Sequence, residues 1–396
     1  IPPVRPSPAA TAATPPTPRE GIETVNLLTT SRLRLHRACP RQHWYRYEMG
    51  RVPVAAESSA LAFGTAIHAA LEAFWRAWMT DGYGSTESAL DALLACGLDP
   101  LSLVKAQVMV SAYCARYMRL AARSTVLAVE VEFSAPLVDP DSGVTSGRWL
   151  LAGKIDAIVR LPDGRVAIVE HKSSGRDASA GSDYRARLTL DAQVGIYFDG
   201  AEALGYAADL CLYDVLVKPS MEPFTATPPE ERKYTKPKSR ACRECAKKAP
   251  APGPHFDEKA QVLCADGQVQ TDPGGVLYAN LRDRDETAEE YAERLMAAVE
   301  ADPDRYLVQA ELVRTAEERD DCRRDVAATV RAIELNRRHG YAPRSAQSCF
   351  VHGRCEYLDA CHAPSMIDDP YRYRRLPIHQ ELSEVTQENT AKENAA

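Results

Sequence analysis

A hairpin with a defined turn constrains the fold of this chain more than any other feature. Residues 149–161 and 165–172 both have the pattern of strands, and Pro-Asp-Gly occupies residues 162–164 between them. Proline suits the second position of a type I turn, and glycine can take the left-handed conformation that closes a three-residue loop. The turn therefore predicts that Leu161 faces Arg165.

This register gathers charged side chains on one face of the hairpin. Counting back from the turn pairs Asp156 with Glu170, and Cβ atoms paired in this way lie about 4.5–5.5 Å apart. Lys172 lies two residues further along the same face, whereas His171 is expected to point away. A turn one residue shorter would shift the register and destroy the arrangement.

Adjacent carboxylates of this kind repel each other unless a cation neutralises them. Mg²⁺ takes one or two carboxylates and completes its shell with water and substrate phosphate. A lysine beside the ion can orient a water and offset charge on the phosphate, so we expect hydrolysis of phosphodiester bonds assisted by Mg²⁺ or Mn²⁺. The alternative, from these residues alone, is an ordinary hairpin with a surface acid and a common Glu-x-Lys pair.

Helical and strand patterns flank the hairpin. His68 and Glu72 lie four residues apart on one face of the first expected helix, and Gln193 and Tyr197 have the same spacing after the hairpin. The expected fold is α/β, with a small mixed central sheet flanked by helices and an N-terminal helical portion packed beside it. The patterns predict helices at 61–79, 90–98, 101–122, 188–204, 285–301 and 311–339, and strands at 126–133, 149–161, 165–172 and 210–217.

The order of these motifs resembles the PD-(D/E)XK nuclease superfamily, which has a restriction-endonuclease-like core, and in particular its RecB/AddB-type, CRISPR-associated and phage exonuclease branch. Isoleucine replaces the proline that names the motif. The resemblance implies that the metal ligands are His68, Asp156 and Glu170 and that the catalytic lysine is Lys172. It also implies that Gln193 and Tyr197 support the active site. An upstream acid also contributes in some members, and either Glu130 or Glu132 matches it.

The cysteines near the two ends of the chain add a second resemblance. Cys349, Cys355 and Cys361 lie close to the C-terminus with five residues between neighbours, and Cys39 stands alone near the other end. This set resembles the iron–sulfur staple of the AddB-like branch, which implies a 4Fe–4S cluster that ties the two ends together. There are three alternatives: zinc binds in the same site, His352 replaces a cysteine as a ligand, or the cysteines are reduced and bind no metal.

Composition limits the remaining choices. The chain has 396 residues and a formal net charge of −7, without an apolar run long enough to cross a membrane. No secretory signal is visible, so we expect a cytoplasmic protein of a bacterium or a phage-infected cell, with cysteines as thiols or metal ligands. Proline-rich residues 1–24 and polar residues 380–396 are expected to be disordered, leaving one nuclease domain over 25–379.

A basic, Pro- and Gly-rich insertion is expected at 219–275. It contains Cys242, Cys245, His255 and Cys264, which form either a zinc site or, as the more common case, an incidental set. Its basic run and a second cluster around Cys39 supply candidate DNA contacts, although a charged run is often only a solvated face. These candidates are Arg37, Arg41, Lys236, Lys238 and Arg240.

These observations predict an Mg²⁺- or Mn²⁺-dependent deoxyribonuclease, acting as an exonuclease on single-stranded DNA or DNA ends. The expected setting is recombination, repair or phage replication beside a helicase or recombinase. One alternative is a DNA-binding subunit that retains the nuclease fold without useful cleavage, and another is a regulator whose functional site is the cysteines. A helicase within the chain is not expected, since no Gly-x-x-x-x-Gly-Lys-Ser/Thr loop occurs.

Overall fold

A computed structural model describes residues 25–54, 59–82, 85–231, 282, 284–351, 353–379 and 382, together with five short strands between residues 234 and 277. The expected tails, 1–24 and 380–396 apart from Leu382, lie outside the described residues. So does most of the expected insertion beyond residue 231. The five short strands are β7 (Tyr234–Thr235), β8 (His255–Asp257), β9 (Val262–Ala265), β10 (Gln268–Gln270) and β11 (Val276–Leu277).

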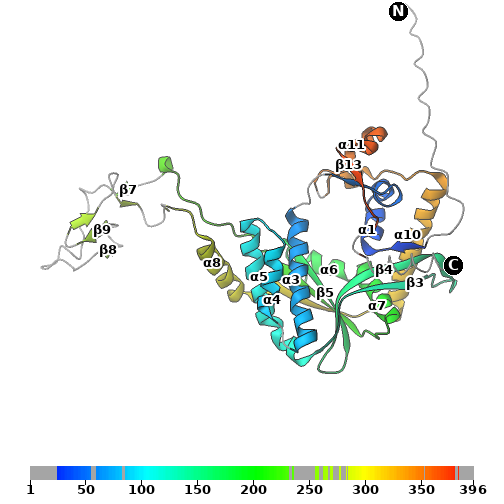
Figure 1. Ribbon diagram of the computed structural model, residues 1–396, viewed down its shortest axis with the longest axis horizontal. Coiled ribbons are helices and arrows are strands. Elements are labelled where there is room, and N and C mark those ends of the chain that lie inside the picture. Colours follow the sequence, from blue (N-terminus) through cyan, green and yellow to red (C-terminus); the bar gives the residue numbers. More distant parts are fainter. Residues whose placement is uncertain are drawn as a thin grey trace, which may run out of the picture.

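A mixed sheet forms the centre of the molecule (Figure 1). Its strand order is β1-β4-β5-β6-β12, and β3 pairs along the other edge of β4. β5 and β6 are parallel, whereas β3, β4 and β5 are antiparallel neighbours. The strands are β1 (Asn26–Leu28), β3 (Thr125–Val138), β4 (Thr145–Arg160), β5 (Val166–Ser174), β6 (Leu210–Val217) and β12 (Leu307–Leu312).

The hairpin between β4 and β5 has the predicted register. Ala157 pairs with Val169, and the pairing continues to Arg160 and Val166. The backbone N–H of Leu161 donates to the carbonyl oxygen of Arg165 at 2.8 Å. Gly164 has a φ of 92°, a conformation that side chains with a Cβ rarely adopt. The Pro-Asp-Gly turn therefore sets the register as its residue types predict.

Three helices cover one face of the sheet. Ala167 and Val169 of β5 pack into the same apolar core as Phe74 and Tyr113 of these helices. Two of the helices begin at side-chain caps, from Ser85 and Asp99. The helices are α3 (Ser59–Asp81), α4 (Thr86–Ala95) and α5 (Pro100–Arg123), and α8 (Ala288–Ala301) packs on the outer side of α5, followed by α9 (Pro303–Tyr306).

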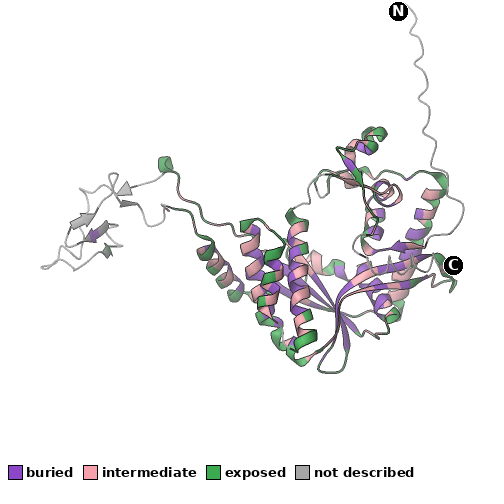
Figure 2. Ribbon diagram, viewed as in Figure 1, coloured by how far each residue is buried: buried purple, intermediate pink, exposed green. Residues whose placement is uncertain are grey.

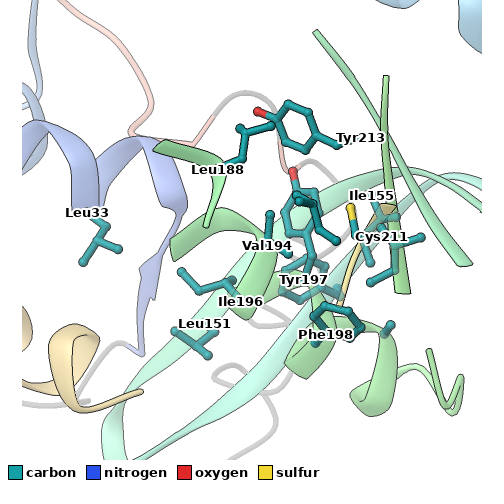
Figure 3. Close-up of a cluster of buried hydrophobic side chains, with 14 of the residues drawn as sticks. Leu33, Leu151, Ile155, Leu188, Val194, Ile196, Tyr197, Phe198, Cys211 and Tyr213 are labelled. Atoms are coloured by element: carbon teal, nitrogen blue, oxygen red, sulfur yellow. The ribbon is translucent and has the colours of Figure 1, made fainter. Parts of the chain in front are cut away.

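The opposite face of the sheet carries the second and larger core. Alternate residues of β5, Val166 and Ile168, belong to this core. Figure 3 shows Tyr197 and Phe198 of the same core beside Ile155 of β4. Figure 2 shows that the sheet is buried between the two helical layers. The helices of this face are α1 (Thr30–Ala38), α6 (Asp183–Leu188), α7 (Ala192–Ala203) and α10 (Ala316–His339).

Several predicted element boundaries differ from the structure, and two of these lie in helices on this face. The expected helix at 188–204 begins four residues later, because the Asp191 side chain accepts the N–H of Gln193 and starts α7 at Ala192, whereas Leu188 ends α6. The expected helix from residue 311 begins at Ala316, and residues 307–312 form β12 against β6. Tertiary pairing with a buried strand produces β12, and no local periodicity indicates it.

The two ends of the described chain meet in a small aromatic unit. Tyr357 stacks between Tyr45 and Tyr373, with ring centroids 5.6 Å away on each side. From the N-terminal part of the chain, the unit contains α2 (Pro40–His43), the π-helix η1 (Trp44–Glu48) and β2 (Arg51–Pro53). From the C-terminal part, it contains the 3₁₀ helices Ala346–Phe350 and Pro364–Asp368, α11 (Leu358–His362) and β13 (Tyr373–Arg375). A further 3₁₀ turn, Pro229–Glu231, lies outside this unit. Among the described residues, no helix is both long and apolar enough to cross a bilayer.

Candidate active site

Along the paired strands β3 and β4, the regular alternation of side chains between the two faces of the sheet is interrupted at one position. Val129 pairs with Ala157 and packs against α3, whereas Val131 pairs with Ile155 and packs on the opposite face of the sheet. Residues two apart normally share a face. The position between them holds Glu130, whose φ is 50°. An irregularity of this kind re-aims side chains, and here it affects two carboxylates.

A close group of three ligand atoms forms at this irregularity. His68, Glu130 and Asp156 each present an atom within 4.8 Å of the other two. His68 comes from α3, and its Nδ1 lies 3.4 Å from Oδ1 of Asp156. Glu72, which shares the helix face of His68, instead pairs with Arg76 at 2.7 Å. Of the two upstream acids that the sequence left open, Glu130 is the one in this group.

Opposing charges dominate the electrostatics of this group. Burial alone would raise the pKa of Asp156, but the charge of His68 and hydrogen bonds from His171 and His68 hold that pKa well below its usual range. Burial would lower the pKa of His68, yet Asp156 raises it above the ordinary histidine value. Burial and repulsion from Asp156 raise the pKa of Glu130, which pairs with Lys154. The group thus concentrates negative charge that a cation would stabilise.

Glu170 lies beside this group rather than within it. Its Oε1 accepts hydrogen bonds from Lys172 Nζ and from Gln193 Nε2, the latter at 2.6 Å, and Gln193 Nε2 also lies 2.8 Å from the Tyr197 hydroxyl. Burial raises the pKa of Glu170 to about 7, with repulsion from Asp156 adding and Lys172 opposing. Burial lowers the pKa of Lys172, but Glu170 and Asp156 outweigh it and hold the pKa above the usual lysine value.

The motif glycine before Asp156 has a packing role. A Cβ on Gly153 would lie 2.9 Å from the Phe133 ring and 3.4 Å from the Tyr197 ring. Only glycine lets these rings pack onto β4 without displacement. This packing holds α7, and therefore Gln193, against the strand that carries Asp156.

His171 was expected to point away from the face that carries Lys172, and its ring does lie toward α3, where Trp75 contacts it. Even so, its backbone N–H donates to Oδ2 of Asp156 at 2.7 Å and its Nδ1 lies 3.3 Å from the same atom. The change of side-chain direction at Asp156 brings its carboxylate to His68 and His171 together. Behind it, Trp75 Nε1 lies 3.3 Å and the Tyr113 hydroxyl 3.0 Å from Nε2 of His171.

The donor set fits a divalent cation. Two carboxylates and one imidazole converge in the close group. The carboxylate oxygens suit magnesium or manganese, which keep several waters. Glu170 Oε2 and Gln193 Oε1 are buried without a hydrogen-bond partner. Buried polar atoms are rarely left unpaired. These free oxygens are the kind of atoms that an ion, or water in its shell, would engage.

The four cysteines of the predicted staple line one cavity of about 250 Å³. Burial raises the pKa values of Cys355 and Cys361, and the neighbouring thiols Cys39, Cys349 and Cys355 add to the effect. Within the described residues, no three of these sulfurs lie within 4.8 Å of one another. A single zinc with 2.3 Å bonds would place its sulfurs about 3.8 Å apart.

The other sequence candidates have mixed outcomes. Arg37 lines a cavity next to Lys172, whereas Arg41 donates to the carbonyl of Ala342 at 2.7 Å and is used within the fold. Cys264 is buried, and the His255 side chain of the candidate zinc set lies outside the described residues. The remaining candidates lie outside the described residues: Cys242, Cys245, Lys236, Lys238 and Arg240.

The fold is a mixed sheet between helices, and its candidate site has carboxylates and an imidazole beside a lysine. This combination is typical of metal-assisted phosphodiesterases. The family model described as the PD-(D/E)XK nuclease superfamily matches residues 27–258, and the chain belongs to this superfamily. The matched segment includes His68, Glu130, Asp156, Glu170 and Lys172, and it ends before the late cysteines. A search of curated proteins found no match. The chain is thus a member of a superfamily of nucleases that use divalent metals and act on DNA.

Proposed function

We propose that this protein is an Mg²⁺- or Mn²⁺-dependent deoxyribonuclease that acts as an exonuclease on single-stranded DNA or DNA ends. The single observation that carries this proposal is the close group of His68, Glu130 and Asp156 beside Glu170 and Lys172. A bound divalent ion supplies Lewis acidity toward the phosphate and acidifies water in its shell.

Each side chain has a distinct role in this proposal. His68, Glu130 and Asp156 hold the ion, and Glu170 contributes its free Oε2 directly or through water. Lys172 orients the attacking water and offsets the negative charge that builds on the phosphate. Gln193 holds Glu170 in place by its 2.6 Å hydrogen bond, and Tyr197 in turn fixes Gln193.

The four cysteines are proposed to bind a structural 4Fe–4S cluster that joins the ends of the nuclease domain. Their shared cavity, and sulfurs spaced more widely than one zinc needs, support this choice over zinc. Anaerobically purified protein should contain about four iron and four sulfide per chain. Cys355→Ser should lose both and become less stable, whereas Cys96→Ser, at an exposed cysteine of the helical layer, should keep them. One zinc per chain without sulfide would overturn the cluster.

The wider role follows from the resemblance of the motifs to RecB- and AddB-like enzymes. On this basis we propose that the protein acts in the cytoplasm of a bacterium or phage-infected cell, in recombination, repair or phage replication, beside a helicase or recombinase. Co-purification of the full chain with such a motor protein would support this role.

The activity is tested by cleavage of end-labelled single- and double-stranded DNA by anaerobically purified protein with Mg²⁺ or Mn²⁺. Asp156→Ala and Lys172→Ala should each abolish cleavage, and the product ladder of the wild type should show stepwise loss from one end. Cleavage that survives both substitutions would mean that the site lies elsewhere. DNA binding without any cleavage by the wild type would favour a binding subunit instead.

A further inference from the structure

A second cavity, of about 490 Å³, opens beside the candidate active site. Lys172 and Gln193 line it, so it adjoins the proposed metal group directly. Its other walls come from α1, from α6, from the turn between α6 and α7, and from Tyr213 of β6. A volume of this size is typical of pockets for small molecules, and it holds a nucleotide but not a duplex.

The walls of this nucleotide pocket are strongly basic. Arg34, Arg37 and Arg187 line it with Lys172, and Asp191 is the one carboxylate among its lining residues. Asp191 is already used as the N-cap of α7. Arg37 donates to the Thr329 hydroxyl at 3.1 Å, so its guanidinium is held by the fold.

The side chains of Arg34 and Arg187 are exposed like that of Arg37, but they differ from it because they make no hydrogen bond or ion pair within the described part of the chain. Arg34 lies close enough to Lys172 for its charge to act on that amine. Two unpaired guanidinium groups beside a lysine repel each other unless an anion joins them. Phosphate oxygens are the anion that arginine recognises best by its planar fork of donors.

The same pocket has an apolar side. Leu33 and Leu188 lie in its wall, with the partly buried ring of Tyr184. Leu190 is 87% exposed at the turn between α6 and α7, also on the pocket. A leucine side chain left in water at the mouth of a basic pocket suits contact with the face of an unpaired base.

We propose that this pocket binds one nucleotide of a single strand next to the cleaved phosphodiester, with Arg34 and Arg187 on its phosphate and Leu190 against its base. This inference rests on the proposed nuclease function and specifies its substrate as an unpaired strand. A base that is paired and stacked in a duplex does not expose a face to Leu190, so the pocket selects single strands or frayed ends.

Binding is measured by fluorescence anisotropy with Ca²⁺ in place of Mg²⁺, using a labelled 12-nucleotide single strand and a blunt hairpin duplex. Arg34→Gln and Arg187→Gln should each weaken binding of the single strand about tenfold. Each should reduce the slope of log affinity against log salt by about 0.7, as loss of one phosphate contact predicts. Arg160→Gln, at an exposed arginine at the far end of β4, is the matched control and should change neither quantity.

The base contact has a separate test. Leu190→Ser should weaken binding of the single strand about threefold without changing the salt slope, and it should have no effect on an abasic strand. Leu94→Ser, at an exposed leucine of α4, is the control. The pocket assignment would be overturned if both arginine variants bound the single strand as well as the wild type does. It would also be overturned if Leu190→Ser weakened binding of the abasic strand as much as binding of the normal strand.

Cleavage by the wild type with Mg²⁺ is measured on the same strands. Failure of the wild type to cleave would refute the nuclease proposal, and the binding data would still decide whether the pocket takes a nucleotide. Wild-type cleavage with unchanged binding in the arginine variants would refute the pocket alone.

Discussion

Glu130 stands opposite Asp156 across the β3–β4 ladder, in a left-handed backbone conformation with a φ of 50°. Such a conformation is uncommon for a residue other than glycine and carries a cost of roughly 1–3 kcal/mol. The conformation turns the Glu130 carboxylate into the group with Asp156 and His68. Strain of this kind persists where the surrounding structure over-determines it, and it clusters at functional sites.

Glu130→Gln should weaken binding of Mn²⁺ by roughly tenfold or more, because it removes one charged ligand from the close group. Glu132→Gln is the matched control: it is two residues away in the same strand and outside that group. Isothermal titration calorimetry of the DNA-free protein measures both affinities. If the two variants bound Mn²⁺ equally well, Glu130 would have no place in the metal site.

His171→Leu should lower the affinity for Mn²⁺ by about ten- to a hundredfold, because His171 fixes Oδ2 of Asp156 through its backbone N–H and its ring. The indole N–H of Trp75 donates to Nε2 and favours the tautomer with its proton on Nδ1, which faces Asp156, whereas the Tyr113 hydroxyl next to Nε2 donates to Asp214. His171→Asn retains an N–H near the position of Nδ1 and should recover part of the loss. Thermal melting of both variants separates this effect from stability. Equal metal affinity in the leucine variant and the wild type would rule out positioning by the ring.

Metal binding should release a proton from His68. Asp156 raises the pKa of His68, so part of the metal-free protein carries a protonated imidazole near neutral pH, whereas a metal ligand must be neutral. The affinity should therefore fall as pH falls through this raised pKa. Calorimetry at one pH in two buffers of different ionisation enthalpy measures the released protons. His68→Asn should release fewer protons than the wild type, with the remainder coming from Glu170, whose pKa is about 7. A wild-type enthalpy that did not vary with buffer would contradict the prediction.

The stability of the fold should decrease in mild acid because of His43. Burial lowers the pKa of His43 to about 2, with the charge of Arg32 adding to the effect, and Arg32 Nε donates to its Nε2 at 3.2 Å. Below pH 6.5 the unfolded chain takes up a proton that the folded protein excludes, so the free energy of unfolding falls as pH falls.

Between pH 7.5 and 5.5 this one group should remove about 1.4 kcal/mol. His43→Gln keeps an acceptor for Arg32, and urea unfolding at the two pH values should show a loss smaller by that amount than in the wild type. Equal losses in the two proteins would show that His43 does not control the acid response.

Local sequence was enough to predict the parts of the site that lie within one element or one turn. Pro162-Asp163-Gly164 sets the hairpin register because turn geometry depends on a few neighbouring residues. Gln193 and Tyr197 meet because residues four apart share a helix face. The superfamily could therefore be inferred from the order and spacing of the motifs, and the family match agrees.

Features that depend on pairing between distant segments could not be predicted in this way. Glu130 and Glu132 have equivalent chemistry in the sequence, and only the change of side-chain direction against β4 places Glu130 at the site. The same change of direction brings the Asp156 carboxylate to His171 as well as to His68. β12 likewise needs β6, whose paired residues lie 91 to 101 positions away, and the pocket joins Arg34 to Arg187 and Leu190 across more than 150 residues.

The sequence by itself thus determined the fold class, the hairpin register and the chemical types at the site, because propensity, turn geometry and helical spacing are local. The tertiary structure decided which carboxylate joins His68 and Asp156, and which arginines remain without partners beside Lys172. Those outcomes depend on how strands distant in sequence pair and twist against one another, and a one-residue irregularity there reverses the direction of a side chain.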